Sequence, residues 1–228
     1  MVFKILAFSI VLSCSSHGHK NMNEKFLKKD LDVNSWITRF ESSKREVFKY
    51  RKEIVRKMKL QKGMVVADIG AGTGAFLEEV SRAVTDDNIV SSRGKVYGVD
   101  ISPKFVSFMN ERVQKEKIKN TEIILGEFDR TTLPMESVDV IFMIDTYHHF
   151  ENPEKMLADI RATLRPGGFM YIIDFDKDSP QLSSFLKKHI INSKESYINQ
   201  IKENGFEFVG SENVPLDQNF MISFRVTK

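Results

Sequence analysis

The sequence predicts an α/β fold built on one doubly wound sheet of seven strands, mostly parallel, with an antiparallel last strand. Apolar runs of strand length alternate with amphipathic segments of helix length between residues 64 and 203, the pattern of a parallel sheet covered on both faces. A glycine-rich loop, DIGAGTG at 68–74, follows the first apolar run. About five residues separate the last two apolar runs, too few for a parallel crossover, so these two strands should pair antiparallel.

The boundaries of the expected elements follow from apolar periodicity and from helix-terminating residues. Ser43 and Glu46 have the spacing of a capping box at the start of the first helix. Pro153 suits a first helical position, and Gly205 ends the last helix. The expected strands are residues 64–68, 95–100, 121–126, 138–145, 169–175, 207–214 and 220–227. The expected helices are residues 43–59, 75–84, 103–117, 153–164 (before the RPGG turn at 165–168) and 180–203.

Composition excludes several classes of protein. The 34 basic and 31 acidic side chains give a net charge of only +3 and are spread along the chain, so no nucleic-acid-binding surface is expected. The single cysteine excludes an internal disulfide, a thiolate zinc cluster and an iron–sulfur site. It also excludes arsenic methylation of the usual kind, which needs several thiols.

The N-terminus has the organisation of a bacterial secretory signal. Lys4 precedes an apolar stretch at residues 5–12, and small residues surround Cys14 in a lipobox-like VLSC segment. We therefore expect an exported protein, anchored to a membrane through a lipid on Cys14; the alternative is a cytoplasmic protein with an apolar extension. The expected division of the chain is a signal segment at 1–14, a polar tether at 15–39 and one domain at 40–228.

The spacing of the glycines in DIGAGTG distinguishes between two kinds of cofactor. Gly70, Gly72 and Gly74 form G-x-G-x-G, whereas a dinucleotide fingerprint is G-x-G-x-x-G. The preceding Asp68 would repel a pyrophosphate in a partly desolvated site and would attract a cation. The loop therefore favours a cationic cofactor without phosphate groups.

Four ordered motifs resemble the class I S-adenosylmethionine-dependent methyltransferases over residues 40–175. The motifs are VVADIGAGTG, GVDIS, ILGEFDRTTLPMESVDVIF and DTYHHFENPEKMLADIRATLRPGG. The sequence is especially similar to the small-molecule branch that includes the ubiquinone/menaquinone-biosynthesis type. This resemblance implies a Rossmann-like sheet with strand order 3-2-1-4-5-7-6, S-adenosylmethionine as cofactor and a small-molecule methyl acceptor.

The same resemblance implies a set of cofactor-binding residues. Asp68 would organise the loop and the amino end of the cofactor, and Asp100 would accept both ribose hydroxyls; a helix cap is the alternative role for Asp100. Asp145 would face the transferred methyl group. The adenine would be covered by Ile101 and bound near Glu127, or near Asp129 because Phe128 is larger than the residue usual at its position. The loop residues whose backbone would pass the cofactor are Gly70, Ala71, Gly72 and Gly74.

The DTYHHF segment contains the expected catalytic candidates. Tyr147 and His148 would line the acceptor pocket beside Asp145, with His148 as general base; a helix cap or a core position is the alternative for this histidine. His149 is expected to be structural. No metal site is expected, since adjacent histidines on an extended segment point to opposite sides.

Other features leave alternatives open. Phe40, Phe48 and Tyr50 would form an aromatic lid over the cofactor, or their helix would simply cover a sheet edge. An NAD-dependent oxidoreductase is the second functional hypothesis, and an exported module that binds the cofactor without turnover is the third. The acceptor and the oligomeric state are not predicted.

Overall fold

The structure, a computed structural model, describes residues 22–85 and 94–227. The expected signal segment at 1–14, including Cys14, lies outside the described residues. Within the described part of the chain, no helix is both long and apolar enough to cross a bilayer.

One seven-stranded sheet forms the centre of the fold, in the order β3-β2-β1-β4-β5-β7-β6. The pairs among β1 to β5 are parallel, and β7 runs antiparallel to both β5 and β6. The predicted fold class, strand order and antiparallel last strand are therefore confirmed. The strands are β1 (Val65–Ile69), β2 (Lys95–Asp100), β3 (Thr121–Leu125), β4 (Val138–Ile144), β5 (Leu164–Phe175), β6 (Phe206–Ser211) and β7 (Asn219–Val226).

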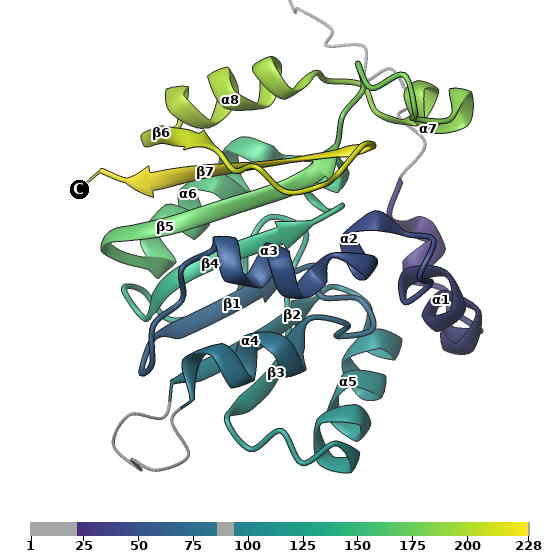
Figure 1. Ribbon diagram of the computed structural model, residues 1–228. Coiled ribbons are helices and arrows are strands. Elements are labelled where there is room, and N and C mark those ends of the chain that lie inside the picture. The colour runs from purple at the N-terminus through teal and green to yellow at the C-terminus, as the bar shows by residue number, and fades with distance from the viewer. Residues whose placement is uncertain (1–21, 86–93, 228) are drawn as a thin grey trace, which may run out of the picture.

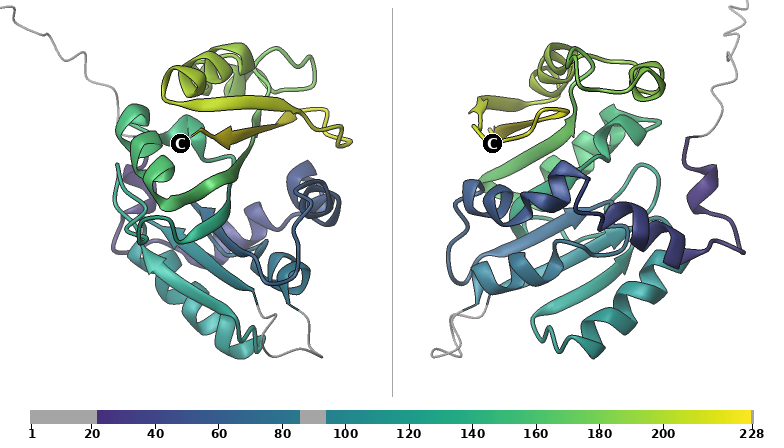
Figure 2. Two further views of the ribbon diagram at one scale, coloured as in Figure 1. Left: turned by 90° about the vertical axis from the view of Figure 1, so that its left-hand side faces the viewer. Right: turned by 45° about the vertical axis from the view of Figure 1, so that its right-hand side comes forward.

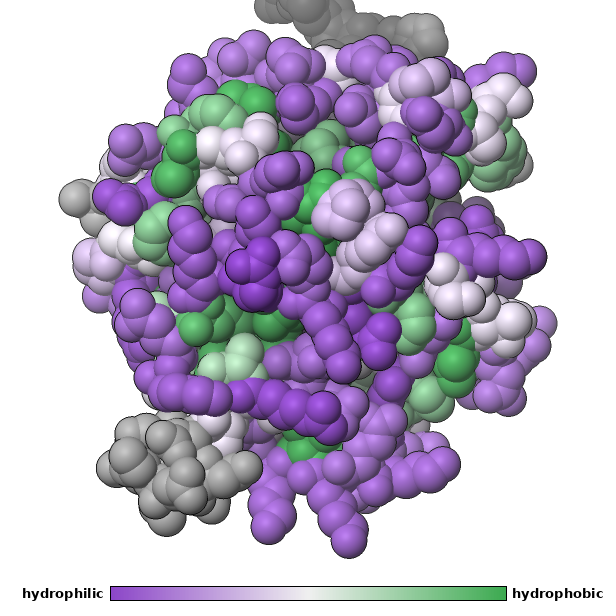
Figure 3. Space-filling view, viewed as in Figure 1, coloured by the Kyte–Doolittle hydropathy of each residue, from purple (hydrophilic) through white to green (hydrophobic). Residues whose placement is uncertain are grey.

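Helices cover both faces of the sheet (Figures 1 and 2). One core cluster joins α2, α3 and α4 to one face, and a second joins α6 and α8 to the other. The face seen in Figure 3 is mainly hydrophilic, with apolar surface in small separate patches. The helices are η1 (Glu24–Phe26), α1 (Val33–Phe40), α2 (Glu46–Lys49), α3 (Arg51–Lys57), α4 (Leu77–Val84), α5 (Pro103–Lys115), η3 (Tyr147–His149), α6 (Pro153–Thr163), α7 (Ser184–His189) and α8 (Lys194–Glu203).

The prediction of a single helix at residues 43–59 is wrong in two respects. It is split at Tyr50 into α2 and α3, and it begins after Arg45, which makes no side-chain cap. The expected capping box does not form, because the Glu46 carboxylate accepts hydrogen bonds from the backbone N–H groups of Asp217 and Gln218 instead. This long-range contact attaches α2 to the loop before β7.

Two further boundaries differ from the prediction. The helix expected at 180–203 is two helices, α7 and α8, each with its own serine N-cap: Ser183 and Ser193. The RPGG segment expected as a turn lies within β5, which begins at Leu164. The break before α8 lets α7 lie beside the carboxyl ends of the strands, separate from α8 (Figure 1).

The segment expected to be a polar tether contains packed structure. The ring of Phe26 in η1 lies 6.1 Å from that of Phe105 in α5, and Trp36 in α1 lies 6.4 Å from the same ring. Asn23 is only 5% exposed. The folded part of the chain therefore begins well before residue 40, and it places η1 and α1 beyond the carboxyl ends of the parallel strands (Figure 1).

Candidate functional site

A cavity of about 610 Å³ opens at the carboxyl ends of the parallel strands. Its walls come from the loops after β1, β2, β3 and β4, from the N-terminal elements η1 and α1, and from α7. This is the edge at which open α/β sheets bind ligands, and the volume is in the range of small-molecule and cofactor sites.

The glycine loop after β1 forms one wall because its backbone turns back on β2. The N–H groups of Gly70 and Ala71 both donate to the carbonyl of Val99, at 2.8 and 3.0 Å. Gly70 and Gly72 have φ of +77° and +57°, the left-handed region that favours glycine. A Cβ on Gly70 would collide with the side chain of Thr146, so the loop passes against the start of η3 with no room for a side chain.

Gly74 has a different role from the one expected. It does not line the cavity; a Cβ there would lie 2.7 Å from Leu77 and 3.2 Å from Met109. Gly74 therefore allows α4 and α5 to pack closely behind the loop. Ala71 lines the cavity as expected.

Asp100 connects the end of β2 to the glycine loop. One carboxylate oxygen accepts from the N–H of Gly72 and the other from the N–H of Ser102, both at 2.8 Å. The residue is 7% exposed and lines the cavity. Burial raises the pKa of Asp100 to about 6, although the two backbone donors act in the opposite direction. Asp100 thus caps the turn before α5 and also presents a carboxylate to the cavity.

Asp68 brings a second buried carboxylate to the same wall. It is 3% exposed and lines the cavity at the end of β1. Burial, and then the nearby Asp100 carboxylate, raise the pKa of Asp68 well above its usual value. Among the described residues, neither carboxylate has a cationic partner. The wall therefore favours a ligand that carries positive charge.

The side chain of Asp145, at the end of β4, is held by two other segments. Arg45 donates to one carboxylate oxygen from Nη2 at 2.7 Å and from Nε at 3.2 Å. Asn219 donates to the other oxygen at 2.6 Å. The backbone of Asp145 has φ of +49°, which an aspartate adopts only where its surroundings fix it, and such residues cluster at functional sites. Asp145 lines the cavity as predicted, but both its oxygens are already engaged.

The expected adenine-binding residues lie around the cavity after β2 and β3. Ile101, Glu127 and Phe128 all line it. Glu127 is paired with Arg130 at 2.6 Å on the exposed rim. Asp129, the alternative, does not line this cavity and lies 3.6 Å from Lys155.

Tyr147 is not placed where it was expected. It is 2% exposed, its hydroxyl donates to Gln200 at 2.8 Å, and its ring packs against Tyr197. Burial raises the pKa of its phenol. The expectation that Tyr147 lines the acceptor pocket is therefore wrong: within the short helix η3 its side chain points into the core.

His148 does line the cavity, and a buried carboxylate fixes its ring. Its Nδ1 lies 2.7 Å from Oδ1 of Asp174, which is fully buried at the end of β5. Burial lowers the pKa of His148, but the carboxylates of Asp174 and, to a smaller extent, Asp145 raise it, and the net shift is upward. In this pair the proton on Nδ1 faces the Asp174 carboxylate, and Nε2 makes no hydrogen bond to the residues that the structure describes.

The aromatic wall differs in part from the predicted lid. Phe40 lines the cavity, with its ring 5.0 Å from that of Trp36, but Phe48 and Tyr50 do not. The other aromatic residues of this wall are Phe26 and Trp36, which line the cavity beside Phe40. Their aromatic character within a polar segment is the only sequence signal that could have revealed them.

Sequence reasoning also missed a polar clamp over the glycine loop. Glu41 accepts from the hydroxyl of Thr73 at 2.8 Å and from Arg112 at 2.6 Å. Arg112 donates in turn to the carbonyl of Thr73 at 3.0 Å. This clamp fixes the residues after α1 against the loop and so closes one side of the cavity.

Taken together, these features define an α/β protein with a cavity of the size of a compact organic ligand at the switch in strand order, against a glycine loop and two buried carboxylates. Residues 60–216 match the family described as methyltransferase domain, and the chain belongs to that family.

Similar proteins agree with this assignment. A solved structure of an S-adenosylmethionine-dependent methyltransferase from Aquifex aeolicus is 27% identical, with a TM-score of 0.72 over 85% of this chain and 98% of that one. An arsenite methyltransferase of Halobacterium salinarum is 30% identical over 52% of this chain and 29% of its own length. A demethylmenaquinone methyltransferase of Geobacillus stearothermophilus is 25% identical over 57% of this chain and 53% of its own length. The chain thus spans between about a third and a half of these two curated relatives.

Proposed function

We propose that this protein binds S-adenosylmethionine and transfers its methyl group to a small molecule. The observation that carries the proposal is the wall formed by Asp68, Asp100 and the glycine loop. Two buried carboxylates without a cationic partner in the described structure suit a ligand with an ammonium and a sulfonium group. They disfavour the pyrophosphate of NAD.

The residues present fit this cofactor in three respects. The outward lone pairs of the Asp100 carboxylate can accept two vicinal hydroxyls, while its existing bonds to Gly72 and Ser102 keep it fixed. A Cβ at Gly72 would lie 3.2 Å from the ring of Phe40, so the missing side chain lets the aromatic wall close against the loop. Trp36 and Phe40, whose ring centroids lie 5.0 Å apart, give the cavity an apolar wall.

When bound, the cofactor supplies an electrophilic methyl group that needs an acceptor aligned with its carbon–sulfur bond. The chain contributes mainly proximity and orientation, which can be worth about 7–11 kcal/mol. Nε2 of His148 is the group in this cavity best placed to take a proton from an acceptor, because Asp174 holds the ring on its other side. We assign Asp145 a positioning role, since Arg45 and Asn219 occupy its oxygens.

The acceptor is proposed only as a class. The curated relatives act, by their names, on arsenite and on a menaquinone precursor, and the aromatic lining of the cavity suits a small organic acceptor. Similarity to the menaquinone-biosynthesis type supports a small molecule rather than a macromolecule.

Turnover of the donor tests this proposal. The full-length protein, incubated with S-adenosylmethionine and a metabolite extract of the source organism, should release S-adenosylhomocysteine. Asp100→Ala should not. If the protein binds the donor but yields no more product than this variant with any extract fraction, the non-catalytic binding module replaces the enzyme as the best account.

The pKa of Asp100 predicts a pH dependence of cofactor affinity. Only the ionised carboxylate accepts from both ribose hydroxyls, and burial raises this pKa to about 6. Affinity should therefore be full above pH 7 and fall as the pH drops through 6, to about one tenth at pH 5. Calorimetric titration with S-adenosylhomocysteine, which has no group of its own titrating in this range, measures the effect. Asp100→Asn should remove most of this dependence, and an equal slope in wild type and variant would assign it to another group.

A further inference from the structure

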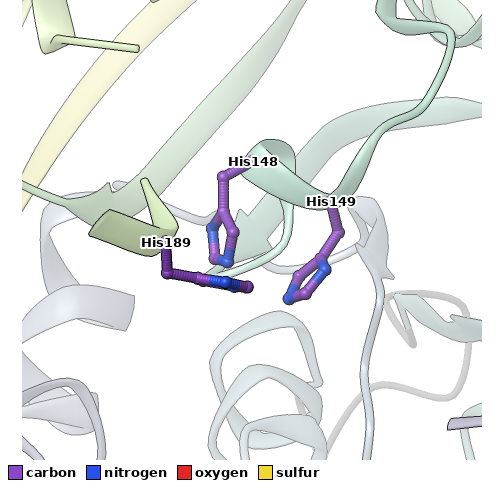
Figure 4. Close-up of side chains that lie close together, drawn as sticks. All are labelled: His148, His149 and His189. Atoms are coloured by element: carbon purple, nitrogen blue, oxygen red, sulfur yellow. The ribbon is translucent and has the colours of Figure 1, made fainter. Parts of the chain in front are cut away.

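Three histidines meet in the wall of the cavity. His148 and His149 lie on η3, and His189 is the last residue of α7. Their ring centroids are 4.2 Å apart for His148 and His149, 5.4 Å for His148 and His189, and 5.7 Å for His149 and His189. One ring nitrogen of each lies within 4.8 Å of one from each of the others, and Figure 4 shows the rings gathered around a common space.

The geometric reason for expecting no metal here does not hold. Adjacent histidines would point to opposite sides on an extended strand, but η3 is a short 3-10 helix. Successive side chains on such a helix are about 120° apart, so two neighbours can face one space. The break between α7 and α8 then brings His189 to the same place.

The hydrogen bonding of the rings leaves nitrogens available as ligands. Nδ1 of His149 is buried and has no hydrogen-bond partner among the described residues. Asp174 occupies Nδ1 of His148 at 2.7 Å and so directs Nε2 toward the cluster. A carboxylate on the outer nitrogen is the usual arrangement behind a metal-binding histidine, because it fixes the tautomer and the ring orientation.

We propose that His148, His149 and His189 bind one divalent transition-metal ion of the zinc class. Three imidazoles without oxygen ligands favour such an ion over magnesium or calcium. Zinc–nitrogen bonds of about 2.0–2.1 Å place tetrahedral ligands about 3.3 Å apart, so small side-chain movements close the cluster from its present spacing. Asp145 lies outside the ligand set because Arg45 and Asn219 hold its carboxylate.

A three-histidine site leaves one position on the ion open. All three histidines line the cavity, so this position faces the space that also reaches Asp100. There the ion can hold a nitrogen, oxygen or sulfur atom of the methyl acceptor. With Nε2 of His148 bound to the ion, that nitrogen would no longer take the acceptor's proton, and the ion would lower the pKa of the bound acceptor atom instead. This role of the ion rests on the proposed function, whereas metal binding itself does not.

Cobalt titration tests the site directly. The full chain, without a histidine tag, is prepared with His17→Ala and His19→Ala so that only the three clustered histidines of the five remain. After treatment with a chelator, it should bind one equivalent of Co²⁺ with the visible absorption of a four-coordinate ion, and Zn²⁺ should displace it. His189→Ala in the same background should weaken binding at least tenfold and lose the absorption.

Two measurements distinguish loss of the metal site from damage to the cofactor site. His189→Ala should retain the thermal stabilisation by S-adenosylhomocysteine, which shows that the fold and the cofactor wall are intact. Unchanged cobalt affinity in His189→Ala, or no stoichiometric binding by the parent protein, would overturn the metal site. Failure of both proteins to bind S-adenosylhomocysteine while cobalt binding is normal would instead contradict the proposed function.

Discussion

Replacing Asp100 with alanine is expected to weaken the binding of S-adenosylmethionine and S-adenosylhomocysteine at least 100-fold. The variant loses two hydrogen bonds from the ligand to a carboxylate, each worth about 1.5–3 kcal/mol, and about 3 kcal/mol corresponds to more than a factor of 100 in affinity. It also releases the N–H of Gly72, which Asp100 holds at 2.8 Å. Equilibrium dialysis or calorimetry measures the change.

Asp139 provides a matched control for this variant. Its carboxylate likewise anchors a backbone N–H, that of Val65 at 2.7 Å, and pairs with Arg165 at 2.6 Å, but it does not line the cavity. Asp139→Ala should lower stability and leave cofactor affinity within about twofold, because it acts only on the fold. Affinity of Asp100→Ala within threefold of the wild type would contradict the assigned role of Asp100.

Replacing Arg45 with methionine is expected to lower the free energy of unfolding by about 3 kcal/mol at pH 7.5. The guanidinium compensates Asp145, whose side chain is only 8% exposed, and removal of one partner leaves a buried charge. Burial raises the pKa of Asp145, so the uncompensated carboxyl should take up a proton, and the loss should shrink as the pH falls toward 5. Urea unfolding at both pH values measures this.

Two further variants separate the buried pair from a general effect of losing an arginine. Arg45→Met combined with Asp145→Asn should recover most of the lost stability, because no charge is then buried without a partner. Asparagine also tolerates the positive φ of this position. Arg56→Met removes an ion pair with Glu53 whose arginine is 68% exposed, and it should cost far less stability than Arg45→Met because solvent screens an exposed pair. Equal losses for Arg45→Met and Arg56→Met would show that Asp145 does not depend on Arg45.

The features that the sequence predicted well depend on short stretches of chain. Apolar runs and turn residues located all seven strands. The glycine spacing predicted the loop after the first strand, in which Gly70, Gly72 and Gly74 all have positive φ. The roles of Asp68 and Asp100 were predicted from the glycine loop and from the resemblance to the methyltransferases. The two residues lie near the carboxyl ends of neighbouring parallel strands, at the same edge of the sheet.

The features that the sequence could not reveal depend on distant contacts. Arg45 lies 100 residues from Asp145, and Glu46 forms its hydrogen bonds about 170 residues away instead of capping its own helix. His189 reaches His148 only because the single helix expected at residues 180–203 is divided into α7 and α8. Tyr147 and His148 differ in role because the 3-10 turn directs one ring into the core and the other into the cavity. Periodicity contains no signal for any of these.

Thermal unfolding of the full-length protein with three ligands tests the central claim most directly. S-adenosylmethionine and S-adenosylhomocysteine at about 100 times their Kd should each stabilise the fold by about 2.7 kcal/mol, which is about 5–10 °C in Tm for a chain of this size. NAD at the same concentration should leave Tm unchanged, because its pyrophosphate would meet Asp68 and Asp100. Stabilisation by NAD alone would contradict the account and would make the cavity a dinucleotide site.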